Sequence, residues 1–86
     1  MGKLKSPLKE LRQGRGMSQA QMALLFGYSK TYISELELGN IKLTERFILV
    51  LDELGLDSKK LAREQRAFRD EKREELKQMF IGNQQS

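Results

Sequence analysis

Two short hydrophobic stripes with helical spacing lie close together in the first half of the chain. Each consists of apolar residues three or four positions apart: Met22, Ala23 and Phe26 in the first, and Ile33 and Leu36, with Tyr32 as a further candidate, in the second. The second stripe begins two residues later than it would if both stripes lay on one straight helix. The stripes can therefore meet only if the chain bends at Gly27, a residue that tolerates the positive φ found at many helix ends. The pattern predicts a helix-turn-helix over residues 19–38.

Hydroxyl side chains stand where helices are expected to begin: Ser6, Ser18, Ser29 and Thr44. Such a side chain accepts a hydrogen bond from a backbone N–H that has no partner in the first turn, and Gln21 completes a capping box with Ser18. Pro7 suits the first helical position, where a missing N–H costs nothing. We expect helices over residues 7 to 14–16, 19–26, 30–38 and 45–54. The last of these supplies much of the core through Phe47, Ile48, Val50, Leu51 and Leu54.

The segment SQAQMALLFGYSKTYISELELGN, residues 18–40, resembles the lambda-repressor and Cro-like helix-turn-helix family of phage and bacterial regulators. Five residues fall at that family's glutamine, small-residue, turn-glycine and two core positions: Gln19, Ala23, Gly27, Ile33 and Leu36. The resemblance extends from about Leu8 to Leu56. It implies a compact all-α domain of four to five helices that binds DNA. It also implies that Arg12 pairs with Glu37, because the family often joins its first and third helices in this way.

Composition changes at Asp57–Ser58, which divides the chain into a DNA-binding domain over residues 1–57 and a charged helix and tail over residues 58–86. Residues 1–34 hold six basic side chains against one acidic side chain, a net charge of +5. A localised basic surface attracts phosphate and releases counterions, so DNA binding should weaken as salt is added.

Several functional classes are disfavoured by composition. The chain has no cysteine and no histidine, which removes thiolate chemistry and the commonest general base and metal ligand. The carboxylates of residues 70–75 alternate with basic side chains, as on a solvated helix face. We therefore expect no enzyme activity, no cofactor and no metal. No apolar run approaches the roughly 20 residues that span a bilayer, so we expect no membrane association and a cytoplasmic location.

Within the predicted recognition helix, Ile33 and Leu36 point inward. Four side chains then point outward as candidate base readers: Lys30, Thr31, Ser34 and Glu35. A lysine can donate to guanine, a hydroxyl can exchange one hydrogen bond or touch a thymine methyl group, and a carboxylate can accept from cytosine N4. The resemblance places the same four positions in the major groove. For Glu35 an equal alternative is an ion pair with a nearby basic side chain such as Lys42.

Phosphate contacts are expected to position the protein on DNA rather than to select a sequence. The resemblance assigns them to Gln19 at the start of the second helix and to Asn40 and Lys42 after the third. Ser29 opens the recognition helix, where free N–H groups attract anions. Tyr32 is a further candidate, although a partly buried ring beside the fourth helix is an equal alternative.

Ser58 is expected to cap a further helix, whose pattern can stay helical to about Phe80, roughly 33 Å at 1.5 Å per residue. It carries sparse apolar residues, of which we select Leu61, Phe68, Leu76, Met79 and Phe80 for dimerisation or partner binding. Three alternatives remain. In the first, this helix packs on a helix, either its symmetry mate or the fourth helix. In the second it captures another protein, and in the third it frays as a solvated tail.

The function expected from the sequence is therefore a sequence-specific regulator of transcription that binds double-stranded DNA. A repressor bound as a homodimer to an inverted-repeat operator is typical of the family resembled. The alternative is a protein-interaction adaptor, or an antitoxin-type component, whose C-terminal helix binds another protein. The two differ in whether the outward side chains of the third helix or residues 58–86 carry the activity.

Overall fold

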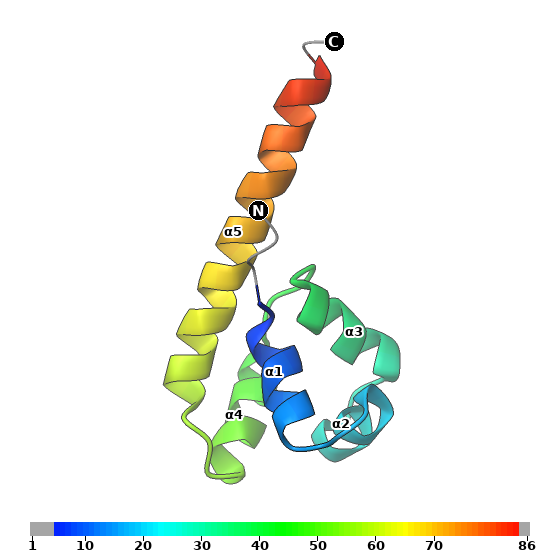
Figure 1. Cartoon of the computed structure of the whole chain (residues 1–86). Helices are drawn as coiled ribbons and strands as arrows, with labels where there is room; N and C mark the ends of the chain where they lie inside the picture. The colour runs from blue at the N-terminus through cyan, green and yellow to red at the C-terminus, as the bar shows by residue number, and fades with distance from the viewer. Residues whose placement is uncertain (1–4, 85–86) are drawn as a thin grey trace.

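A computed structural model describes residues 5–84 of the chain, and five helices with no strand make up this described part (Figure 1). The helices are α1 (Pro7–Gly14), α2 (Gln19–Phe26), α3 (Lys30–Leu38), α4 (Glu45–Glu53) and α5 (Ser58–Gln84). The all-α prediction is confirmed. The described residues contain no helix that is both long enough and apolar enough to cross a membrane.

The first four helices begin at the predicted caps. The hydroxyl oxygens of Ser6, Ser18, Ser29 and Thr44 each accept a hydrogen bond from the backbone N–H three residues later. Ser18 and Gln21 form the full capping box, because the Ser18 N–H also donates to Gln21 Oε1 at 2.9 Å. These helix starts were predictable because every partner lies within three residues in the sequence.

The start and end of α5 differ from the prediction. Asp57, rather than Ser58, caps the helix, because its carboxylate accepts from the Lys60 N–H at 3.1 Å. Ser58 is instead the first helical residue, and its buried hydroxyl donates to the Asp52 carboxylate. The helix continues to Gln84 rather than to about Phe80, which makes it roughly 40 Å long.

One hydrophobic core lies among the helices. Its buried members are Leu8, Met22, Ala23, Phe26, Ile33, Leu36, Phe47 and Leu51. The rings of Phe26 and Phe47 stack with centroids 4.4 Å apart, which joins α2 to α4. Of the other predicted core residues in this region, Ile48 and Val50 are only partly buried, and Leu54, the C-cap residue of α4, is exposed.

The first half of α5 packs beside α1 and α4, and the second half extends away from the other helices (Figure 1). Leu61 packs against the core and Phe68 is buried. The selection of these two residues as a dimer or partner surface is therefore corrected, because both are used within the domain. Leu76, Met79 and Phe80 remain exposed.

Candidate nucleic-acid interface

Helices α2 and α3 form the predicted helix-turn-helix. Gly27 adopts φ +78°, and the N–H groups of Gly27 and Tyr28 both donate to Ala23 O at 2.9 Å. Ala23 is buried in the core that joins the helices, where a small side chain permits close packing. The turn therefore ends α2 and redirects the chain into α3 within three residues.

The inner and outer faces of α3 are clearly separated. Ile33 and Leu36 are fully buried. Lys30 and Thr31 are exposed, whereas Ser34 and Glu35 are partly buried. The first turns of α2 and α3 carry no acidic side chain of their own that would offset the partial positive charge of the helix N-termini. The arrangement presents polar groups next to two anion-attracting helix ends.

The predicted base reader Glu35 and the predicted phosphate ligand Asn40 contact each other. Asn40 Nδ2 donates to Glu35 Oε1 at 3.0 Å, and the Asn40 backbone N–H donates to Glu35 O. The alternative partner considered for Glu35, Lys42, is not the residue that holds it here. The amide fixes the carboxylate at the solvent edge of α3.

The predicted phosphate ligand Gln19 belongs to a network that ties α1, α2 and α3 together. Gln19 Nε2 donates to Glu37 Oε1 at 3.0 Å. Arg12 Nε and Nη2 donate to the two oxygens of Glu37 at 2.6 and 3.1 Å, and Arg12 Nη1 donates to Met17 O. The structure contains the Arg12–Glu37 pair that the resemblance implied. Because the pair is largely buried, its main consequence is to fix where α3 lies relative to α1.

The hydrogen bond to Glu37 raises the pKa of Arg12, more than burial lowers it. The guanidinium is therefore charged at neutral pH, where it donates to Glu37 and Met17.

Tyr32 fits the alternative of a partly buried ring better than that of a phosphate ligand. Its ring stacks on Tyr28 with centroids 4.2 Å apart and packs against the core. Its hydroxyl oxygen is buried and has no hydrogen-bond partner among the described residues. In this packing the Tyr32 hydroxyl would have to leave its buried position to reach a phosphate.

Arg46 was missed by the sequence analysis. It lies at the start of α4, and its guanidinium sits 4.8 Å from the centre of the Tyr28 ring and donates to Gly27 O at 3.4 Å. This places an exposed cation against the turn between α2 and α3. Sequence spacing gave no signal for it, because the turn that it contacts is 19 residues away.

Helix α5 supplies two further residues that the sequence analysis did not select. Gln65 Nε2 donates to Leu36 O at 2.8 Å, and Arg69 Nε donates to Gly39 O at 3.1 Å. Both acceptors lie at the C-terminal end of α3. The only sequence signal was position, because Gln65 lies four residues after Leu61 and three before Phe68, on the same face of a helix.

A family model described as helix-turn-helix matches residues 8–61 of the chain. No curated protein and no solved structure matches. The matched segment covers nearly all of α1, the whole of α2 to α4 and the first turn of α5, and it leaves out Gln65, Phe68 and Arg69, which contact the end of α3.

Proposed function

Because the chain belongs to the lambda-repressor and Cro-like helix-turn-helix family of DNA-binding regulators, we propose that it is a sequence-specific repressor that binds an inverted-repeat operator as a dimer. The observation that carries the proposal is the outer face of α3. This face presents Lys30 and Thr31 to solvent while the buried face of the same helix is fixed in the core.

The base readers are Lys30, Thr31, Ser34 and Glu35. Lys30 donates to guanine O6 and N7, and the two hydroxyls exchange a hydrogen bond with a base edge or touch a thymine methyl group. Glu35 accepts from cytosine N4 while Asn40 holds its other side. Each good contact discriminates between bases by about 1–3 kcal/mol.

Phosphate binding is assigned to groups around the two helix N-termini and the loop after α3. The first backbone N–H groups of a helix have no partner within it, so those at Gln19 and Ser29 can bind a phosphate even while the Gln19 side chain holds Glu37. Lys42 and Arg46 are exposed cations. Arg46 lies against the turn between α2 and α3, and Lys42 follows α3 in the same loop as Asn40. Such contacts set the register on DNA and make affinity depend on salt.

A second copy of the chain is needed because a nine-residue recognition helix spans only a few base pairs. Residues Gln65, Phe68, Lys72, Leu76 and Met79 are three or four positions apart and share one face of α5. That face is covered by the domain as far as Lys72 and is exposed beyond it. We assign the exposed part, Leu76 and Met79, together with the adjoining Phe80, to contact with the same residues of a second copy, which gives the two-fold symmetry that an inverted repeat requires.

Repression follows from binding alone. A protein that occupies an operator overlapping a promoter excludes other proteins from that DNA, and no further activity is needed. The described helices leave little besides a DNA-reading surface and an apolar helix stripe, which is sufficient for this mechanism.

Selection of bound duplexes from a random DNA library, at near-physiological salt and with sequencing of the enriched pool, tests the proposal. We expect an enriched inverted repeat whose half-sites are about 34 Å apart, one helical turn of DNA. Enrichment of a single half-site would refute the dimer but keep the DNA reader. Failure of folded protein to enrich any sequence would refute the proposal and favour the adaptor, with the Leu76, Met79 and Phe80 stripe as its binding surface.

A further inference from the structure

The C-terminal end of α3 is held by α5. Gln65 is 1% exposed, and its side-chain amide reaches the carbonyl oxygen of Leu36. One turn later, Arg69 reaches the carbonyl oxygen of Gly39. Between them, the Phe68 ring covers Gly39 so closely that a Cβ atom at this glycine would lie 2.8 Å from Phe68 Cε2. Three successive contacts of α5 therefore converge on the last residues of the recognition helix.

These contacts act where a helix is least constrained. The last carbonyl groups of a helix have no partners within it, and water or a cap must satisfy them. Gly39 provides part of the cap, since its N–H donates to Leu36 O and its φ is +81°. Gln65 and Arg69 add side-chain donors from a different helix. They fix the end of α3 to α5, which an internal cap cannot do.

The other end and inner face of α3 are held by different elements. Gly27 and Tyr28 determine where α3 begins. On the inner face, Arg12 of α1 and Gln19 of α2 hold Glu37, the second-last residue of α3. The contacts from α5 complete the set on the side away from α2. A recognition helix must present its side chains to base edges in a defined orientation, because hydrogen bonds weaken steeply when misaligned. We therefore expect the loss of one contact that holds α3 to weaken base reading before it unfolds the domain.

We propose that Gln65, Phe68 and Arg69 are positioning residues for DNA recognition, which hold α3 in the orientation that reads bases. The proposal rests on the proposed function, and it assigns part of the DNA-reading apparatus to residues beyond the family-matched segment 8–61. It also means that the same helix that carries the exposed apolar stripe supports the recognition helix.

Gln65→Met is the most direct variant. It removes the donor to Leu36 O but keeps the length of the side chain, and Leu36 O retains its bond from the Gly39 N–H. It also removes Gln65 Oε1, a buried oxygen without a hydrogen-bond partner among the described residues, so the midpoint of thermal unfolding should change little. Gln78→Met, an exposed position on the same helix, is the matched control.

The readout is the ratio of affinities for the selected operator and for a scrambled duplex, measured at one salt concentration. For Gln65→Met we expect specific affinity to fall about two- to tenfold, the worth of one hydrogen bond, with nonspecific affinity unchanged. Amide hydrogen exchange at Gly39 and Asn40 should also accelerate. A merely structural role would lower the unfolding midpoint and leave the affinity ratio of the folded protein unchanged, which would overturn the proposal.

Arg69→Gln supplies a second test, with exposed Arg63→Gln as the control for the lost charge. A positioning role predicts that Arg69→Gln lowers the specificity ratio while both variants change the salt dependence of binding equally. A salt slope reduced by about one in Arg69→Gln alone would make Arg69 a phosphate ligand and overturn its assignment. If the unmodified protein enriches no operator, the proposed function fails. If it binds an operator and both Gln65→Met and Arg69→Gln keep its specificity ratio, only the positioning role fails.

Discussion

The two halves of α5 have the same helical conformation, but they differ in charge, with a net +3 over residues 58–72 and zero over residues 73–84, and in their surroundings. The proximal half, residues 58–72, buries Gln65 and Phe68 and packs Leu61 on the core. The distal half, residues 73–84, extends beyond the other helices and leaves Met79 and Phe80 more than 60% exposed (Figure 1). Only the proximal half is therefore part of the folded domain, and the apolar side chains of the distal half remain available for another molecule.

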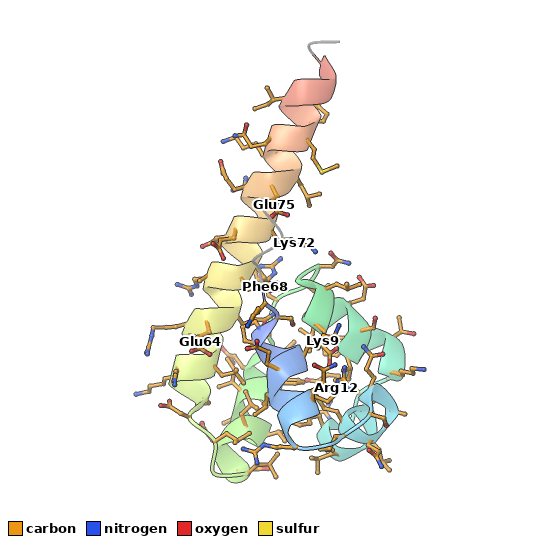
Figure 2. The ribbon with its side chains drawn as sticks, in the orientation of Figure 1. Lys9, Arg12, Glu64, Phe68, Lys72 and Glu75 are labelled. Atoms are coloured by element: carbon orange, nitrogen blue, oxygen red, sulfur yellow. The ribbon has the colours of Figure 1, made fainter. Side chains whose placement is uncertain are left out.

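A cleft marks the boundary between the two halves. Its walls come from the N-terminal part of α1, the end of α3 and the middle of α5. Figure 2 labels four of its residues: Lys9 on α1, and Phe68, Lys72 and Glu75 on α5. Beyond this cleft no helix lies beside α5 in Figure 1, so the apolar residues of α5 are buried only as far as the other helices extend.

The largest difference between the halves should appear when the same residue type is truncated in each. Phe68 is 7% exposed and Phe80 is 63% exposed. Phe68→Ala should reduce the free energy of unfolding by about 3–5 kcal/mol, since it removes a buried ring and leaves a cavity. At protein concentrations where the chain is monomeric, Phe80→Ala should change it by less than about 0.5 kcal/mol. Chemical denaturation of both variants measures this, and equal effects would contradict the division of α5.

A smaller effect isolates the contact between Phe68 and Gly39. Gly39 and Gly55 have nearly the same φ, +81° and +79°, but a Cβ atom would meet the Phe68 ring only at Gly39. Gly55→Ala should cost about 1–2 kcal/mol from backbone strain alone. Gly39→Ala should cost about 1–3 kcal/mol more, because the ring must move. Thermal unfolding of the pair gives the difference, and a Phe68→Leu background should reduce it if the ring is responsible.

The smallest expected effect on stability comes from removing the distal half. Deletion of residues 73–86 leaves Leu61, Gln65 and Phe68 in place, so the free energy of unfolding of the monomer should change by less than about 1 kcal/mol. Sedimentation equilibrium should show a dimer for the full chain and a monomer for the shortened one. A shortened chain that still dimerises would place the interface elsewhere, and one that unfolds would show that the distal half supports the domain.

The sequence predicts the parts of the fold that depend on nearby residues. The helix starts at Ser18, Ser29 and Thr44, the turn at Gly27 and the inward positions of Ile33 and Leu36 all follow from spacings of a few residues. Their causes are local hydrogen bonds and the helical repeat. The outward direction of Lys30 and Thr31 follows as a complement of the buried face.

The remaining features depend on contacts between distant segments. Gln65 and Arg69 are polar residues in a charged helix, and only the fold brings them within reach of carbonyl groups 29 and 30 residues away. The sequence also does not determine which of two possible partners a polar side chain contacts. Glu35 had several neighbours of suitable chemistry, and the geometry of the α3 C-terminus selects Asn40. Likewise Asp57 and Ser58 are both good caps, and the bond from Ser58 to Asp52 leaves the capping role to Asp57.

The central claim is that the outer face of α3 reads base sequence, and alanine at Lys30, Thr31 and Ser34 together tests it most directly. The measurement is the affinity of this variant for the selected operator and for a scrambled duplex, with Lys60→Ala as an exposed, equally charged control. We predict that specific affinity falls at least about a hundredfold, nonspecific affinity falls only slightly, and the control keeps its specificity. Unchanged specific affinity in the folded triple variant would contradict the account.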